Sequence, residues 1–266
     1  MIGESGQHFS YYTTGDSHNP PILFLHGFMG DRTEFHAVML SLASQYYCIS
    51  IDLPGHGDLL TDRDLSNYTI IDTARALIEF LNAFQIEKCH LVGYSMGGRL
   101  ALYLALHFPE YFLKIVLESA SPGLKTASER SDRWQSDLKL AERLETGDLE
   151  LFLRQWYEQP IFAALREHPD FEKLLEQRSQ NDPVALARSL RHLSVGCQPS
   201  LWEKLSENTI PLLLLVGELD LKFVNINTEM ANLCQLAKLE IIPHCGHNIH
   251  FENTNLFIEK IKHFLL

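Results

Sequence analysis

The feature that most constrains the fold is a short apolar run that ends in a serine framed by glycines. This run, Leu91-Val92-Gly93-Tyr94-Ser95-Met96-Gly97-Gly98, contains the pattern G-x-S-x-G and leads into a segment of helical periodicity. At such a strand-to-helix turn the serine is strained at the head of the helix, and the glycines permit a close backbone approach that a side chain would block. The pattern therefore predicts an exposed hydroxyl beside the backbone N–H of the next residue. A glycine-rich turn without chemistry is the less favoured alternative.

Short apolar runs alternate along the chain with longer segments of helical periodicity. This alternation predicts an α/β fold with a mostly parallel central sheet and flanking crossover helices. The predicted strands cover residues 22–25, 47–51, 89–92, 115–117, 212–216 and 239–242. The predicted helices cover residues 31–45, 70–84, 96–108, 227–234 and 256–265.

The strand pattern stops between residues 122 and 205, where long polar-apolar segments are rich in Arg, Glu, Gln and Trp. We interpret residues 122–205 as a helical cap inserted into a core made of residues 1–121 and 206–266. Open α/β sheets bind ligands outside the carboxyl edge of their strands. The cap is therefore expected to roof the site.

Charge and cysteine usage limit the partners and the compartment. A formal net charge of -12 over 266 residues argues against nucleic acid and anionic membrane, so an anionic small substrate would need a local cluster of positive charge. The first residues lack the basic and apolar segments of a secretory signal, and no apolar run approaches the roughly 20 residues of a membrane span. Five cysteines without a CxxC pair suit reduced thiols. We expect a cytoplasmic protein without membrane insertion.

A serine hydroxyl is a poor nucleophile or base at neutral pH, so a histidine must take its proton and a carboxylate must orient the histidine. In the α/β-hydrolase fold these residues follow one another in the order serine, acid, histidine. The last two predicted strands lead into loops that carry Asp220 and His247. We therefore predict an α/β-hydrolase fold with Ser95, Asp220 and His247 as its catalytic triad.

Other residues compete for these roles or support them. Glu218 is the rival acid, although a position directly after a strand more often serves the turn, and His244 and His250 are rival bases more typical of solvated or packing histidines. The oxyanion donors are expected to be the backbone N–H groups of Phe28 and Met96. We expect His26 to brace the loop that carries Phe28, and the 52–57 segment to shape a neighbouring loop.

Longer motifs make the chain similar to one family within this fold. It resembles the MenH family, the 2-succinyl-6-hydroxy-2,4-cyclohexadiene-1-carboxylate synthases of menaquinone and phylloquinone biosynthesis, over nearly its whole length. Met96 stands where that family often has leucine, and Ser121 where some members carry histidine. The segments that carry the resemblance are Gly93–Arg99, Glu118–Leu124, Arg133 with Ser136-Asp137, Trp156–Phe162, Arg178–Asn181, Gly217–Phe223 and Gly246–Asn248.

The resemblance implies a carbon–oxygen lyase that eliminates pyruvate from 2-succinyl-5-enolpyruvyl-6-hydroxy-3-cyclohexene-1-carboxylate, a substrate with three carboxylates. His247 would draw the proton from Ser95, whose oxygen then removes a ring proton, and the oxyanion donors would meet the negative charge that develops on the ring carboxylate side. A serine hydrolase, either an esterase or a carbon–carbon bond hydrolase, is one alternative. A non-catalytic protein of this fold that binds a small ligand is another.

Arginine offers permanently charged, bidentate donors to carboxylates, and Arg99 lies four residues after Ser95 on one helix face. An internal salt bridge is the alternative for Arg99. The resemblance implies that Arg133 and Arg178 also bind substrate carboxylates, although the bare sequence favours solvated helix faces for both.

Three aromatic residues complete the implied site. Trp156 would donate its indole N–H to a carboxylate, Phe162 would pack against the substrate ring and Tyr94 would donate its hydroxyl to the bound acid; core packing is the competing use of each. Neither a metal nor an organic cofactor is implied, because HExxH, CxxC and dinucleotide fingerprints are missing. Whether the protein is a monomer or a weak homo-oligomer stays open.

Overall fold

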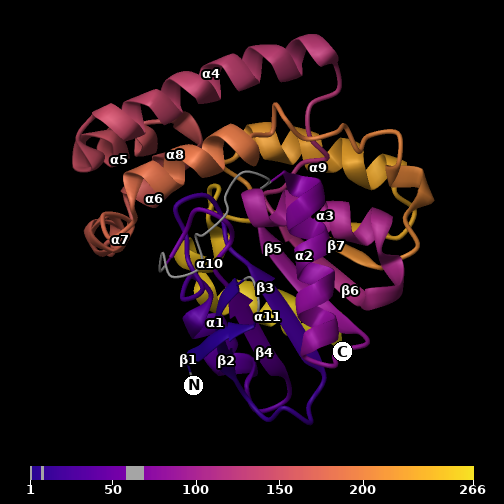
Figure 1. Ribbon diagram of the computed structural model, residues 1–266. Helices are drawn as coiled ribbons and strands as arrows, with labels where there is room; N and C mark the ends of the chain where they lie inside the picture. The colour runs from indigo at the N-terminus through magenta and orange to yellow at the C-terminus, as the bar shows by residue number, and fades with distance from the viewer. Residues whose placement is uncertain (1, 7–8, 58–68) are drawn as a thin grey trace.

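The computed structural model describes residues 2–6, 9–57 and 69–266, and eight strands within these ranges form one sheet (Figure 1). Their order across the sheet is β1-β2-β4-β3-β5-β6-β7-β8, with β2 antiparallel to both of its neighbours and all other pairs parallel. In chain order the strands are β1 (Ile2–Gly6), β2 (Phe9–Thr14), β3 (Pro21–Leu25), β4 (Tyr47–Ile51), β5 (Cys89–Tyr94), β6 (Phe112–Glu118), β7 (Leu212–Gly217) and β8 (Ala237–Ile242).

Helices cover both faces of the sheet (Figure 1). Around the sheet they are α1 (His36–Leu42), α2 (Ile70–Ala83), α3 (Met96–His107), α9 (Leu221–Leu233), α10 (Ile249–Glu252) and α11 (Thr254–Leu265), with single 3₁₀ turns at Pro109–Tyr111 and Leu205–Glu207. Between β6 and β7 they are α4 (Ala127–Thr146), α5 (Leu149–Tyr157), α6 (Ala163–Arg166), α7 (Phe171–Arg178) and α8 (Pro183–His192), with a 3₁₀ turn at Pro160–Phe162.

The alternation of side chains along each strand divides the core into two layers. Leu23 and Leu25 of β3 pack with α2, α3 and α9, whereas Ile22 and Phe24 of the same strand pack with α1 and α11. Strands buried on both faces read as continuous apolar runs, which is why the sequence reveals them. The same arrangement brings the carboxyl ends of β3, β5, β7 and β8 to one edge of the sheet.

The predicted fold class is confirmed, and each of the six predicted strands lies within one of β3 to β8. The sequence reading missed β1 and β2. Two helix predictions were wrong in their bounds: the helix predicted at 31–45 is restricted to His36–Leu42, and the one predicted at 227–234 begins earlier, at Leu221. In the first case residues 32–35 form turns, because Glu34 and Phe35 both point into the protein.

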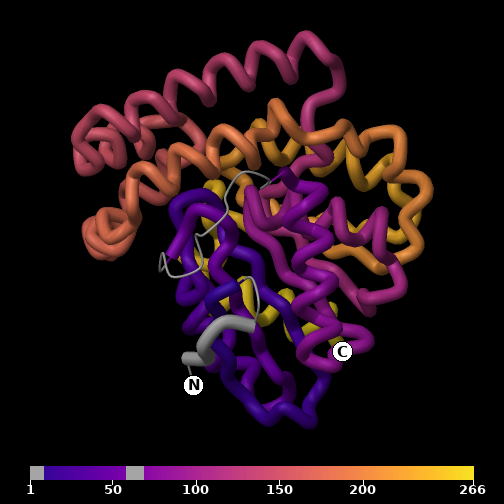
Figure 2. Tube along the Cα trace, viewed as in Figure 1, coloured from indigo at the N-terminus to yellow at the C-terminus, as the bar shows by residue number. Residues whose placement is uncertain are grey.

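Figure 2 shows the chain leaving the sheet after β6, running through the helical segment and returning to β7. All of residues 122–205 are described, and they contain helices and loops without a strand. These helices share an apolar cluster of their own, which includes Leu144, Phe152 and Leu186 and takes in Met29 from the loop after β3. Among the helices in the described part of the chain, each falls short of the length and hydrophobicity that crossing a membrane requires.

Candidate active site

Ser95 joins β5 to α3 in a backbone conformation that residues with a side chain rarely adopt. Its φ of 48° and ψ of -103° lie in the left-handed half of the map, at a cost on the order of 1–3 kcal/mol. The neighbouring glycines leave room for the turn: a Cβ on Gly97 would overlap the Leu25 carbonyl oxygen, and one on Gly93 would lie 2.6 Å from the Gly97 carbonyl oxygen. The hydroxyl is therefore held at the head of α3, as the motif predicts.

The structure brings Ser95, His247 and Asp220 together although they are far apart in the chain. His247 Nε2 lies 3.0 Å from Ser95 Oγ, and His247 Nδ1 lies 2.6 Å from Asp220 Oδ2. Asp220 is 1% exposed and His247 is 2% exposed. With hydrogen on Nδ1, the imidazole donates to the carboxylate, and Nε2 is left to accept the serine proton. This is the geometry that a proton-transfer triad requires.

Local structure explains how the acid and the base reach the serine. Asp220 follows β7 and caps α9, where its other carboxylate oxygen accepts the Phe223 N–H at 3.4 Å. His247 lies in the loop between β8 and α10. Both loops leave the same carboxyl edge of the sheet as Ser95, and their side chains meet the serine there although β6 lies between β5 and β7.

The rival acid and bases have other partners. The Glu218 carboxylate accepts the backbone N–H of His244 at 3.1 Å, and both residues are exposed. His250 is buried, and its Nδ1 lies 2.7 Å from a carboxylate oxygen of Glu118. The Glu218 carboxylate and the His250 imidazole therefore have other partners, and His244 is exposed. The predicted pair of Asp220 and His247, in contrast, is assembled beside Ser95.

The two predicted oxyanion donors lie beside the serine. Phe28 and Met96 line the same cavity as Ser95. Met96 is the first residue of α3, where backbone N–H groups lack a partner within the helix. In the described ranges the N–H groups of Phe28 and Met96 make no hydrogen bond within the protein. His26 braces the loop as expected, since its Nδ1 lies 2.7 Å from the Gly27 carbonyl oxygen and its Nε2 accepts the Leu53 N–H.

The cavity in front of Ser95 lies between the sheet edge and the helices α4, α5 and α8. Its walls combine Ser95 and His247, the residues of the oxyanion donors, apolar side chains and charged groups. Within the described residues, three cationic side chains line it, those of Arg99, Arg133 and Lys222, and Asp137 is the one acidic side chain. The cavity is thus positively charged in a protein whose net charge is -12.

Arg99 is held in the cavity wall by neutral acceptors. Its two terminal nitrogens donate to Gln198 Oε1 at 2.6 Å and to the Leu193 carbonyl at 2.8 Å. Among the described residues, no carboxylate forms an ion pair with Arg99, so the internal salt bridge considered as an alternative is not formed. Burial, followed by repulsion from Arg133, lowers the pKa of Arg99 to about 10. A carboxylate in the cavity would relieve this unfavourable burial of charge.

Arg133 and Lys222 complete the cationic lining. Arg133 Nε donates to both carboxylate oxygens of Asp137, at 2.8 and 2.9 Å, and in the described ranges its terminal nitrogens make no hydrogen bond. Lys222 was missed by the sequence reasoning, although it is in the first turn of α9, two residues after Asp220. Burial and the charge of Arg133 lower the pKa of Lys222. An aspartate at the N-cap position, Asp220, is the sequence signal that would have placed Lys222 in the first turn of α9.

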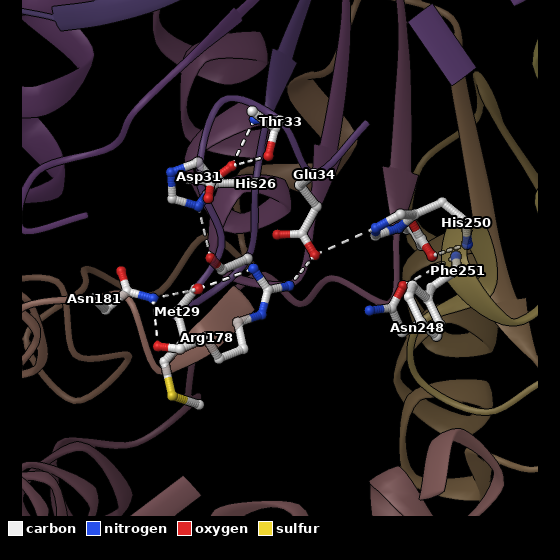
Figure 3. Close-up of polar contacts among 12 residues, drawn as sticks. His26, Met29, Asp31, Thr33, Glu34, Arg178, Asn181, Asn248, His250 and Phe251 are labelled. Atoms are coloured by element: carbon white, nitrogen blue, oxygen red, sulfur yellow. Dashed lines mark hydrogen bonds and ion pairs between the residues drawn. The ribbon is translucent and has the colours of Figure 1, made fainter. Parts of the chain in front are cut away.

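Arg178 is a correction to the sequence-based site. Its side chain is buried, forms an ion pair with Glu34 and donates to the Met29 carbonyl at 2.9 Å, so it lies behind the Phe28 loop and is not part of the cavity lining (Figure 3). The physical reason is that the buried Glu34 carboxylate requires a cation. The prediction that Arg178 contacts a substrate carboxylate does not match this position.

Trp156 and Phe162 are in the predicted place. Both line the cavity, where the Trp156 ring lies 5.2 Å from the Phe28 ring and the Phe162 ring lies 5.6 Å from the His247 ring. The indole N–H of Trp156 makes no hydrogen bond with the described residues, which leaves it available to a ligand. Their proposed contacts with a substrate stay predictions.

Tyr94 is a second correction. It is buried behind the triad, with its ring 5.5 Å from that of His247 and 4.9 Å from that of His250, and it is not among the residues that line the cavity. A Cβ on Gly27 would lie 2.5 Å from its ring, which shows how tightly it packs. Packing, the competing use, is therefore what the structure shows for Tyr94, because the strand alternation turns it away from the cavity.

This fold and this serine, histidine and aspartate geometry define a protein of the α/β-hydrolase class. In agreement, residues 20–254 match the family described as alpha/beta hydrolase fold. A 2-succinyl-6-hydroxy-2,4-cyclohexadiene-1-carboxylate synthase of Serratia proteamaculans is 35% identical over 95% of this chain and 95% of its own. The enzyme of the same name from Escherichia coli is 38% identical over 88% of this chain and 89% of its own. The solved structure of MenH from S. aureus superposes with a TM-score of 0.91, at 34% identity, over 97% of this chain and 98% of that one.

The chain therefore belongs to the 2-succinyl-6-hydroxy-2,4-cyclohexadiene-1-carboxylate synthase (MenH) family. An enol-lactonase from Burkholderia xenovorans, 17% identical with a TM-score of 0.82, shares the fold alone. In the ranges that the structure describes, no group of three or more His, Cys, Asp or Glu side chains could hold a metal ion.

Proposed function

We propose that the protein is a carbon–oxygen lyase that eliminates pyruvate from 2-succinyl-5-enolpyruvyl-6-hydroxy-3-cyclohexene-1-carboxylate, in menaquinone or phylloquinone biosynthesis. The observation that carries the proposal is one cavity in which a serine–histidine–aspartate triad faces Arg99, Arg133 and Lys222. The names of the relatives point to the same reaction.

The charges of the cavity suit this substrate. Its three carboxylates would meet the three cations, two of which, Arg99 and Lys222, have no carboxylate among their hydrogen-bond partners in the described part of the chain. Burying the Arg99 guanidinium without an anion is costly, so its position in the cavity wall is best explained by an anionic ligand. A site for an uncharged ester would gain nothing from this arrangement.

The chemistry uses the triad as a proton relay. His247 accepts the proton of Ser95 while the serine oxygen removes the ring proton next to the succinyl ketone. The single ring double bond then shifts, a second ring double bond forms, and the carbon–oxygen bond to enolpyruvate breaks. The ring proton thereby restores the serine hydroxyl. The departing enolpyruvate takes up the proton held by His247 and becomes pyruvate, which returns His247 to its starting form.

The Phe28 and Met96 N–H groups would stabilise the enolate oxygen that forms when the ring proton leaves. Losing one such donor typically costs about 3 to 4 kcal/mol of barrier. Because the ring proton lies next to a ketone, the charge is placed on that oxygen, and the ring carboxylate itself is held by a cation.

The proposal includes the division of the chain into a core of residues 1–121 and 206–266 and a cap of residues 122–205 that contributes Arg133 and Trp156. It also includes a cytoplasmic location. All five cysteines are free thiols, which is the usual state in a reducing compartment.

A coupled assay for pyruvate, with the substrate generated in place, tests the proposal. We expect the purified protein to release pyruvate, and Ser95→Ala or His247→Ala to lower kcat about 10³-fold or more. Arg99→Met and Lys222→Gln should each raise KM about tenfold or more, since a hydrogen bond to a charged group contributes about 1.5–3 kcal/mol.

Lys88→Gln is the matched control for Lys222→Gln, because Lys88 is exposed and precedes β5 at the opposite end of the sheet. It should leave both constants unchanged. A burst of covalent intermediate with a generic ester, without pyruvate release, would favour a serine hydrolase. Tight binding of the triacid without turnover would favour a ligand-binding protein.

A further inference from the structure

Four buried charged side chains form an alternating chain behind the active site, and Figure 3 shows three of them, Arg178, Glu34 and His250. Arg178 of α7 pairs with Glu34, the His250 Nε2 of α10 lies 3.4 Å from Glu34 Oε1, and the His250 Nδ1 lies 2.7 Å from Glu118 Oε2. The four side chains are between 0% and 6% exposed. They connect the cap, the loop after β3, the loop after β8 and the end of β6.

The chain is charged at neutral pH. Burial alone would raise the pKa of Glu34, but the charges of Arg178 and His250 lower it to about 2. Burial alone would lower the pKa of His250, but Glu118 and Glu34 raise it to about 9. Buried ion pairs are often no more stabilising than apolar packing of the same volume, so this arrangement calls for an explanation other than stability.

The cap end of the chain holds the oxyanion loop. The Met29 carbonyl accepts one hydrogen bond from Arg178 Nη1 at 2.9 Å and another from Asn181 Nδ2 at 3.0 Å. Met29 has a φ of 67°, which residues with a side chain rarely adopt without support from their surroundings. It directly follows Phe28, whose N–H is a candidate oxyanion donor.

The loop also anchors the peptide that carries this N–H. The Gly27 carbonyl accepts the Gly30 N–H at 3.0 Å and lies 2.7 Å from His26 Nδ1. Since C=O and N–H point in opposite directions across a trans peptide, fixing the Gly27 oxygen aims the Phe28 N–H the other way. The turn is thus held at Gly27 by its own loop and at Met29 by the cap.

The far end of the chain holds the serine and the histidine. The backbone carbonyl of Glu118 accepts the Ser95 N–H at 2.9 Å, and its carboxylate accepts the backbone N–H of His250 at 2.9 Å. His250 follows His247 by three residues. One network of charges therefore spans the oxyanion loop, the histidine loop and the serine turn.

We propose that Arg178 is a positioning residue, which acts from the cap with Asn181 to hold the Met29 carbonyl and so to align the Phe28 N–H with Ser95. The inference rests on the proposed function only in that Ser95 is the reacting residue. It follows that the oxyanion site is complete only when α7 is seated on the loop. Arg178 then acts on the rate of the chemical step and not on the capture of a carboxylate.

The split between kcat and KM separates the two roles. Asn181→Ala should lower kcat about fivefold, the worth of one neutral hydrogen bond. Arg178→Lys keeps the charge but loses the forked donors, and should lower kcat about tenfold or more. In both variants KM should stay within about twofold of the wild type, as expected for an interaction made only in the transition state.

Matched controls use cap residues outside the network. Gln180→Ala removes an exposed amide beside Asn181 whose contacts are with Glu176 and Ser179, and Arg191→Lys alters an arginine paired with Glu145 within the cap. Both should keep the wild-type kcat. If Arg178→Lys or Asn181→Ala instead raised KM with kcat unchanged, Arg178 would be a substrate ligand and the inference would be wrong.

A fluorophosphonate probe gives a second readout that does not depend on the natural substrate. It labels the serine hydroxyl, and its phosphoryl oxygen occupies the oxyanion site. Labelling should slow in Arg178→Lys and Asn181→Ala by about the same factors as kcat, and should be unaffected in Gln180→Ala and Arg191→Lys. Normal labelling of the wild type without pyruvate release would refute the proposed function alone. Equal labelling of Asn181→Ala, Arg178→Lys and wild type, or no labelling of the wild type, would overturn the inference.

Discussion

Ser95 adopts a left-handed backbone conformation that glycine adopts without strain. The position therefore allows the strain to be measured apart from catalysis. Ser95→Gly and Ser95→Ala both remove the hydroxyl and should both abolish pyruvate release. We expect Ser95→Gly to be more stable than Ser95→Ala by about 1–2 kcal/mol, because only the alanine keeps the strained backbone. Chemical denaturation of the two variants measures the difference.

The same pair of substitutions at Ser136 is the control. Ser136 is exposed on α4, where glycine is about 1 kcal/mol less favourable than alanine, so the order of stability should be reversed. An alanine variant as stable as the glycine variant at position 95 would mean that the backbone there is not strained.

At the scale of the element, one side chain both caps α9 and takes part in the proposed triad. Asp220 caps the helix through one carboxylate oxygen and orients His247 through the other. Asparagine caps helices as well as aspartate does, but it cannot fix the same imidazole tautomer or balance its charge. Asp220→Asn should therefore lower kcat about 10⁴-fold while the free energy of unfolding falls by less than about 1 kcal/mol.

The comparison with Asp220→Ala separates the two roles. Alanine removes the cap as well, so it should cost about 1 kcal/mol more stability than asparagine while activity is equally low. Asp148→Asn and Asp148→Ala at the cap of α5, away from the triad, should show the same stability difference and keep full activity. Retention of activity in Asp220→Asn would remove Asp220 from the triad.

The elements also show what sequence patterns can predict. Strands β3 to β7 were identifiable because their buried residues form apolar runs, and the partly exposed edge strand β8 was identifiable from its short run at 239–242. Chain order then placed Asp220 and His247 beside Ser95. Strands β1 and β2 carry mixed residues because they lie at the antiparallel edge of the sheet, and a short mixed run carries little periodic signal.

Contacts between distant residues are the part that the sequence does not reveal. Arg178 was assigned to the substrate because its motif resembles a family, yet its partner is Glu34, 144 positions away. Nothing local marks Glu34 as buried, since a glutamate within an apparently helical run is normally solvated. The role of Lys222 was missed for the related reason that its helix begins earlier than its apolar pattern does.

At the scale of the whole molecule, an acidic protein keeps its buried charges in opposed pairs. The net charge is -12, but the four charged groups from Arg178 to Glu118 sum to zero, and the unmatched cations face the cavity. Because each of these buried charges is balanced by a neighbour of opposite sign, the stability of the fold depends on all four groups staying ionised. The member whose pKa is nearest to working conditions is His250.

The free energy of unfolding should therefore fall as the solution becomes alkaline. Burial opposes the charged form of His250, but Glu118 and Glu34 outweigh it and raise the pKa to about 9, above the usual 6.5. A pKa raised in the folded state contributes stability that is full below pH 6.5 and is lost as the pH rises through 9, here about 3 kcal/mol.

The His250→Gln variant should be less stable than the wild type at neutral pH, but its free energy of unfolding should fall less between pH 7 and 9. Buried Cys48, whose pKa burial raises to about 12, adds the same alkaline decline to both proteins, so urea unfolding of the pair isolates the histidine. Parallel declines in the two proteins would mean that His250 is neutral in the folded state.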